Sequence, residues 1–123
     1  MSKVVLSIII PCYNSEATLE ETLISVVGQD YDCWEAILVN DGSPDCLEKI
    51  ALAWKEKDSR IHYYKKKNGG LGSARNYGIE KAKGKYILPL DSDNKVRSTF
   101  AKDAISILKN KEHIGVVYGN AEY

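Results

Sequence analysis

The chain has 123 residues, the size of one ordinary domain. Hydrophobic residues make up 44% and charged residues 28% of the sequence, which favours a folded core and excludes intrinsic disorder. The 17 Lys and Arg residues balance the 17 Asp and Glu residues, and a net charge of zero gives no sign of a nucleic-acid partner. The three cysteines lack the spacing of a disulfide framework or a zinc site, so reduced thiols in a cytoplasmic protein are expected.

The first half of the chain alternates between strand-like and helix-like patterns. "VVLSIII" (4–10) is an apolar, β-branched run typical of a strand covered on both faces, and it is too short to span a membrane. A helix is expected to follow, with Ser15 as its N-cap and Gly28 at its end. "WEAILVN" (34–40) predicts a second strand, and Asp45 is placed to cap the helix after it.

The second half continues the alternation. "IHYY" (61–64) predicts a third strand, and the glycine-rich "NGGLGS" leads into a helix over 73–83 that is capped by its first residue. "YILPL" (86–90) predicts the fourth strand, followed by a helix over 98–108 and a fifth strand, "GVVYG", over 115–119. Strands that alternate with helices indicate an α/β fold, in which a mainly parallel sheet carries helices on both faces.

Polar residues and glycines follow the predicted strands. In an open parallel sheet, ligands bind beyond the carboxyl ends of the strands, which all lie at one edge. The segments expected at this edge are 11–16, 40–43, 68–72 and 91–94, and they are rich in carboxylates, amides and glycine. The sequence therefore predicts a binding site where these four segments converge.

Asp91 and Asp93 come directly after the fourth strand, with Ser92 between them. Two carboxylates so placed could share a hard cation such as Mg²⁺ or Mn²⁺, which needs few protein ligands when a substrate's phosphates supply the rest. On these residues alone, either aspartate could instead cap the turn that follows.

The other segments also allow two interpretations each. Asp41 could accept a hydrogen bond from a nucleobase or only belong to an Asp-Gly turn. Tyr13 could stack on a base or pack at the margin of the core, and Arg75 could pair with a phosphate or with a nearby acid. The lysine run 65–67 could solvate a strand end or attract phosphate.

Taken together, three segments resemble the inverting, family 2 glycosyltransferases with the GT-A fold. They are "SIIIPCYNSEATLEETLISVVGQ", "EAILVNDGSPD" and "NGGLGSARNYGIEKAKGKYILPLDSDN", which carry the motifs P-x-Y-N, D-G-S, G-x-x-x-A-R-N-x-G and D-x-D in order. The resemblance implies a Rossmann-like GT-A sheet. It also implies that residues 1–123 are the N-terminal, nucleotide-sugar-binding part of a longer enzyme.

The resemblance implies roles for the positions that match the motifs. Asp41 would hydrogen-bond the base, and Asp93, with Asp91, would hold Mn²⁺ or Mg²⁺ at the diphosphate. Asn40 departs from the family pattern, because the family usually has Asp there. The positions implied to bind the nucleotide sugar are Pro11, Tyr13, Asn14, Glu16, Asp41, Gly70, Arg75, Asp91 and Ser92.

The implied reaction moves a sugar from a nucleotide-diphosphate sugar, most often a UDP-sugar, to an acceptor hydroxyl with inversion, in polysaccharide or cell-surface glycan synthesis. The catalytic base and the site for a saccharide or lipid-linked acceptor would lie beyond residue 123. This chain would then bind nucleotide but transfer little or no sugar. The full-length enzyme would be cytoplasmic or membrane-associated, and the uncovered fifth strand could pair two copies.

Two alternatives from other classes remain open on sequence patterns alone. A phosphohydrolase could use D-x-D as nucleophile and acid, and a receiver-like module would be a binding domain without enzymatic activity. Both would normally carry their paired acids after the first strand, whereas here the pair follows the fourth.

Overall fold

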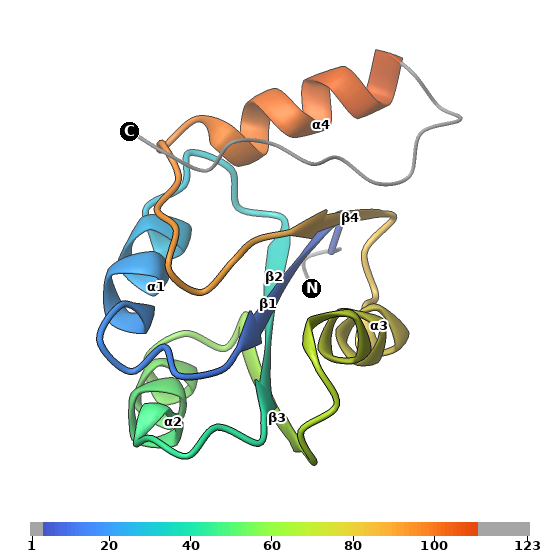
Figure 1. The fold of residues 1–123 in the computed structure, drawn as a ribbon. Helices are drawn as coiled ribbons and strands as arrows, with labels where there is room; N and C mark the ends of the chain where they lie inside the picture. Colours follow the sequence, from blue (N-terminus) through green and yellow to red (C-terminus); the bar gives the residue numbers. More distant parts are fainter. Residues whose placement is uncertain (1–3, 111–123) are drawn as a thin grey trace.

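The computed structural model describes residues 4–110, and within this part of the chain four strands alternate with four helices. The strands form one sheet in the order β3-β2-β1-β4, with every neighbouring pair parallel, so the expected α/β fold is confirmed (Figure 1). The strand expected at 115–119 lies outside the described residues. In chain order the elements are β1 (Leu6–Cys12), α1 (Leu19–Val27), β2 (Trp34–Asp41), α2 (Leu47–Lys57), β3 (Ile61–Lys66), α3 (Leu71–Lys81), β4 (Tyr86–Pro89) and α4 (Phe100–Asn110).

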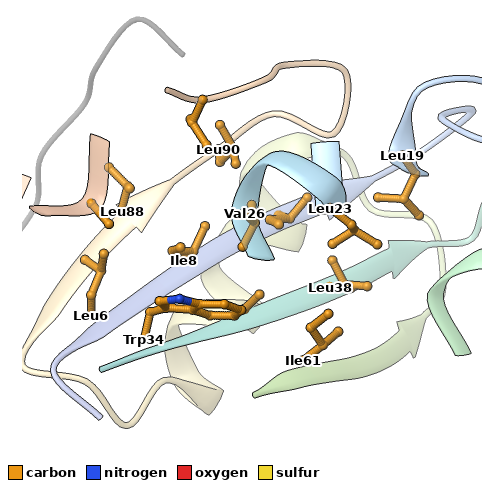
Figure 2. Close-up of a cluster of buried hydrophobic side chains, with 14 of the residues drawn as sticks. Leu6, Ile8, Leu19, Leu23, Val26, Trp34, Leu38, Ile61, Leu88 and Leu90 are labelled. Carbon is orange, nitrogen blue, oxygen red and sulfur yellow. The ribbon is translucent and has the colours of Figure 1, made fainter. Parts of the chain in front are cut away.

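Helices cover both faces of the sheet (Figure 1). Alternate residues of β1 point to opposite faces, and every residue of that strand is buried. On one face Ile8 packs in a cluster that includes Trp34 of β2 and side chains of α1 (Figure 2). Side chains of α2 and α4 belong to the same cluster. On the other face Ile9 packs in a second cluster with Ala74 of α3. Burial on both sides explains why the sequence of β1 is apolar without alternation.

The first strand begins and ends two residues later than the sequence predicts, and it includes Pro11. Proline lacks an N–H and is tolerated in a strand only where no ladder bond is needed. Ile9 pairs with Pro89 at the end of the β1–β4 ladder, and its carbonyl accepts the N–H of Leu90 at 2.8 Å. Pro11 faces the same side beyond this last pair, so its missing N–H interrupts no bond to β4.

The predicted N-caps of α1 and α3 are wrong. The helix α1 starts at Leu19 instead of following Ser15 directly, because the carbonyl of Ser15 accepts the N–H groups of Thr18 and Leu19 in a separate turn. The helix α3 starts at Leu71, ahead of the predicted cap Ser73. The chain enters it through Gly70, whose φ of 96° is accessible to glycine at no steric cost.

Several other boundaries differ by one or two residues from the sequence-based expectation. The strand β3 continues through part of the lysine run to Lys66, and α3 ends at Lys81 rather than at residue 83. The helix α4 begins at Phe100, two residues later than expected. The N-cap of α2 is Cys46 rather than the predicted Asp45, although Asp45 Oδ1 does accept the N–H of Leu47 at 3.2 Å. Within residues 4–110, no helix is both long enough and apolar enough to cross a membrane.

Candidate functional site

The carboxyl ends of β1, β2 and β4 and the start of α3 surround one cavity of about 400 Å³. This volume is within the usual range for small-molecule sites. The cavity lies where the sequence placed the site, beyond the carboxyl ends of the parallel strands. The predicted site residues that line it are Pro11, Tyr13, Asn14, Asp41, Asp91, Ser92 and Asp93.

Asp91 and Asp93 bring two exposed carboxylates to this cavity, whereas Ser92 between them is buried. The turn closes on itself, since the N–H of Asn94 donates to the carbonyl of Asp91 at 3.1 Å. Asp91 Oδ1 lies 3.5 Å from Nη2 of Arg75, a long and largely solvent-exposed ion pair. Within the described part of the chain, no hydrogen bond or ion pair of the Asp93 side chain is seen.

The two carboxylates do not by themselves make a complete set of metal ligands. Among residues 4–110 there is no group of three or more His, Cys, Asp or Glu side chains that could hold an ion by itself. Mg²⁺ and Mn²⁺ accept one or two carboxylates when phosphate oxygens and water complete their coordination. Asp91 and Asp93 therefore fit a divalent ion that arrives with a phosphate-bearing ligand.

The carboxylate of Asp41 is buried and is hydrogen-bonded within the protein. Its oxygens accept the N–H groups of Gly69 and Gly70, each at 2.9 Å, and the ammonium group of Lys66 at 3.0 Å. Burial alone would raise the pKa of Asp41, but the hydrogen bonds from Gly69, Lys66 and Gly70 outweigh it and hold that pKa below its usual value. A carboxylate has about four acceptor sites, so about one remains for a ligand.

The hydrogen bonds of Asp41 involve two features that the sequence predicted to act otherwise, Gly70 and the lysine run 65–67. The N–H of Gly70 is donated to Asp41, so this glycine shapes the loop before α3 and does not itself line the cavity. Lys66, from the lysine run, is mostly buried and pairs with Asp41, whereas the run was expected to be solvated or to attract phosphate. Asn68 ties the same loop to β2 through its amide, which donates to the carbonyl of Asp41 at 2.9 Å.

Glu16 and Arg75 do not line the cavity either. Glu16 Oε1 accepts the N–H of Cys46 at 3.1 Å, and the N–H of Glu16 donates to Asp45 Oδ2 at 2.9 Å. The segment after β1 is thereby fastened to the start of α2, and the Glu16 carboxylate bonds this junction rather than lining the cavity. Arg75 lies in the second turn of α3, since that helix begins earlier than predicted, and it reaches the cavity only through Asp91.

Tyr13 stands at the cavity with half of its surface exposed. The next residue, Asn14, has φ of 54°, a left-handed conformation that Asn tolerates better than most residues. Its N–H donates to Ser43 Oγ at 2.9 Å, which fixes the turn after β1. This turn leaves the ring of Tyr13 available to a ligand.

Asn40, the departure from the family motif, is hydrogen-bonded inside the protein through both its amide nitrogen and its amide oxygen. Its Nδ2 donates to the hydroxyl of Tyr63 at 2.9 Å, and its Oδ1 accepts the N–H of Ser43 at 2.9 Å. The Tyr63 hydroxyl donates in turn to Glu48 Oε1 at 2.7 Å. An ionised Asp at position 40 could accept from Ser43 but could not donate to Tyr63, so the amide suits this arrangement.

Five cavity residues were not singled out by sequence reasoning. Cys12 gave no signal as a strand residue, and burial raises its pKa to about 12, so its thiol stays protonated and is a poor nucleophile. The other residues come from the turn after β1, from α1's N-cap and from the start of α3; they are Ser15, Thr18, Leu71 and Ala74. Two of them, Ser15 and Leu71, fall within the segments expected at this edge.

A parallel α/β sheet with a polar cavity beyond its strand ends defines a ligand-binding domain of the doubly wound class. The family model described as "Glycosyl transferase family 2" matches residues 7–123. The chain belongs to glycosyltransferase family 2.

Individual relatives agree with this membership. The chain is 47% identical over 92 residues to the uncharacterized glycosyltransferase EpsJ of Bacillus subtilis, a match that covers 75% of this chain and 27% of EpsJ. It is 39% identical over 115 residues to the minor teichoic acid biosynthesis protein GgaB of the same species, covering 90% of this chain and 13% of GgaB. The chain thus spans well under half the length of these relatives.

The solved structures show the same fold. The crystal structure of S. aureus TarS 1–349 in complex with UDP superposes with a TM-score of 0.81 at 28% identity. The similarity covers 89% of this chain and 33% of the TarS chain. The GT-A-like fold implied by the sequence motifs is therefore confirmed, and the matched region makes up about a third of the TarS chain.

Proposed function

We propose that this chain is the nucleotide-sugar-binding part of a glycosyltransferase that uses a UDP-sugar and a divalent ion. The observation that carries the proposal is that Tyr13, Asp91 and Asp93 line one cavity, although β1 and β4 lie far apart in the sequence. The aromatic ring offers a stacking surface for a base, and the two carboxylates offer ligands for an ion at the diphosphate. TarS, solved with UDP and with UDP-GlcNAc, supports a uridine nucleotide as the donor.

Asp93 and Asp91 are the residues that would hold Mn²⁺ or Mg²⁺. When bound, the ion supplies positive charge that offsets the charge of the leaving diphosphate. The chain's own residues do the rest of the binding: Tyr13 contacts the base, and Asp41 fixes the loop that forms the α3 side of the cavity. The remaining acceptor site of Asp41 could receive a base N–H.

The proposed transfer is a single displacement with inversion. The acceptor oxygen forms a bond to the anomeric carbon while the bond from that carbon to the diphosphate oxygen breaks on the opposite face. The hydroxyl proton passes to a base that we place outside residues 1–123, together with the acceptor site. The name of GgaB supports an acceptor in cell-surface polymer synthesis, a saccharide or a lipid-linked sugar.

Calorimetric titration with UDP tests the proposal. We expect binding in the presence of Mn²⁺ that weakens about tenfold or more when EDTA replaces the metal, and an equal loss in Asp93→Ala, because removing a ligand removes the ion. Asp103→Ala is the matched control, since Asp103 is an exposed acid on α4 and not a cavity residue. UDP binding that neither EDTA nor Asp93→Ala changes would remove the metal from the proposal, and no binding of UDP at all would refute the nucleotide site.

A further inference from the structure

The segment between β4 and α4 carries Asp91 and Asp93, and it has no regular secondary structure. Irregular segments that pass through a protein interior must find hydrogen-bond partners for their backbone groups. Ser92 and Val96 in this segment are buried, at 9% and 3% exposure. Side chains of α1 and of the residues that flank its two ends supply part of the partners that this backbone needs.

Two threonines, Thr18 and Thr22, bind the turn that contains the carboxylates of Asp91 and Asp93. The hydroxyl of Thr22 donates to the carbonyl of Ser92 at 2.9 Å, and the hydroxyl of Thr18 donates to the same carbonyl at 3.1 Å. Thr22 is fully buried. Both bonds reach the residue that lies between Asp91 and Asp93, so they fix the centre of the turn.

Two further polar side chains hold the continuation of the segment. Ser25 Oγ accepts the N–H of Val96 at 3.1 Å. Gln29 is 8% exposed; its Nε2 donates to the carbonyl of Arg97 at 2.6 Å, and its Oε1 accepts the N–H of Ala101 at 2.8 Å. One amide side chain thus bonds both the end of the irregular segment and the first turn of α4.

We call these four residues the polar stripe of α1: Thr18, Thr22, Ser25 and Gln29. Thr18, the N-cap, and Thr22 and Ser25 within the helix are separated by four and three positions, which puts them on one side of α1, and Gln29 lies just past the C-cap Gly28. In these contacts they bind backbone groups of residues 92–101, so they determine the path of the chain whatever side chains that segment carries. The same helix packs its apolar residues Leu19, Leu23 and Val26 against the sheet.

We infer that the polar stripe of α1 is a positioning device for the ion-binding carboxylates, so that Thr18 and Thr22 are positioning residues for the transfer reaction. This inference rests on the proposed function. The carboxylates themselves are solvent-exposed and lack a cage of other protein ligands among the described residues. Their placement therefore depends on the backbone between them, and the stripe bonds that backbone directly. Groups that orient the ligands of an ion typically change its affinity by about 10- to 100-fold when they are removed.

The test compares Thr18→Val/Thr22→Val with the wild type by titrating UDP with Mn²⁺ and with EDTA. Valine keeps the shape of threonine and removes the hydroxyl. We expect the ratio of UDP affinity with Mn²⁺ to that with EDTA to fall about tenfold, while UDP affinity in EDTA changes less than about twofold. Thr22→Ser keeps a hydroxyl and should retain the wild-type ratio. Thr99→Val is the matched control, because within the described residues the Thr99 hydroxyl is not seen to bond the turn.

A second measurement needs no ligand. Hydrogen exchange of the Asn94 amide reports the turn, because that N–H donates to the carbonyl of Asp91. In the double valine variant the Asn94 amide should exchange about tenfold faster than in the wild type, whereas the exchange rates of the β1 amides should stay the same. Should the double variant not fold, the same two measurements are made on Thr18→Val and Thr22→Val as single variants.

The outcomes separate this inference from the proposed function. A wild type in which Mn²⁺ leaves UDP affinity unchanged refutes the metal-dependent function, and the exchange rate of Asn94 then still decides whether the stripe orders the turn. A folded valine variant that keeps both the wild-type metal ratio and the wild-type exchange rate overturns the inference, whatever the status of the function. A loss of melting temperature with no change in either readout also overturns it, because the stripe would then serve stability alone.

Discussion

The carboxylate of Asp41, at the end of β2, accepts the N–H of Gly70, the residue that precedes the first turn of α3, at 2.9 Å. The same carboxylate accepts the N–H of Gly69. A strand end and a helix start that are 29 positions apart are thus held together by one buried side chain. This arrangement places Leu71 and Ala74 of α3 at the cavity.

Asp41→Asn should loosen this connection. An amide has one acceptor oxygen, so one of the glycine N–H groups would face an NH₂ group, and a buried donor would be left unsatisfied. We expect a loss of about 1–3 kcal/mol in the free energy of unfolding, measured with urea, together with faster hydrogen exchange at Gly69 and Gly70. Glu20→Gln on the exposed side of α1 is the control. Unchanged hydrogen exchange at both glycines in the variant would contradict the role of Asp41 in holding the strand end to the helix start.

The pH dependence of stability follows from three aspartates whose pKa values are lowered in the folded state, Asp41, Asp45 and Asp58. Hydrogen bonds, chiefly from Arg60, lower the pKa of Asp58, and those from Ser43, Glu16 and Leu47 outweigh burial at Asp45. The unfolded chain binds protons to these groups more readily, so their contribution is present above about pH 4, the unfolded value, and is lost as pH falls through the lower folded values.

Urea unfolding in steps from neutral to acid pH measures this effect. We expect the free energy of unfolding to decrease as pH falls below about 4, with a smaller decrease in Asp41→Asn, which lacks one of the three groups. An equal slope in the two proteins would show that the Asp41 carboxylate is not stabilised by its partners.

The sequence was sufficient for the order of strands and helices along the chain, but not for the details of the site. Apolar runs and glycine-rich turns indicated each element of residues 4–110, and the rule that ligands bind at strand ends brought together Tyr13, Asp91 and Asp93. Sequence patterns could not show that the carboxylate of Glu16 bonds the start of α2, because that contact depends on how two loops pack. The polar stripe has a signal in the sequence, because Thr18, Thr22 and Ser25 are polar residues at helical spacing. Their partners could not be predicted, because these are backbone groups, which no side-chain pattern reveals.

Gly78 shows how closely α3 approaches the sheet. A Cβ at this position would lie 2.6 Å from Cγ2 of Ile9 and 3.3 Å from Cγ2 of Val39. Gly78→Ala should therefore destabilise the fold by about 1–3 kcal/mol through overpacking, although alanine favours helices. Gly72→Ala on the same helix meets nothing within 4 Å and should be neutral or stabilise by up to about 1 kcal/mol. Urea unfolding of both variants measures the contrast, and a stabilising Gly78→Ala would disprove the close approach.

The cysteines should differ sharply in reactivity. Cys12 lines the cavity but is 1% exposed, and its pKa of about 12 leaves almost no thiolate at neutral pH, whereas Cys46 is exposed. Iodoacetamide at mildly alkaline pH should alkylate Cys46 and leave Cys12 unmodified until urea unfolds the chain, as read by peptide mass spectrometry. Labelling of Cys12 in the folded protein would mean that the end of β1 opens to solvent.

Substitution of Tyr13 should distinguish binding of the base from binding of the phosphates. Its ring is half exposed at the cavity, so Tyr13→Ala should change the free energy of unfolding by less than about 0.5 kcal/mol. Stacking of a base on an aromatic ring contributes about 1–3 kcal/mol, so the same change should weaken UDP binding by about tenfold or more, while Tyr13→Phe retains it. Pyrophosphate carries no nucleobase that could stack on the ring, so in the presence of Mn²⁺ it should bind Tyr13→Ala and the wild type equally. Equal losses for UDP and pyrophosphate would place Tyr13 at the phosphates, and no loss for either would remove it from the site.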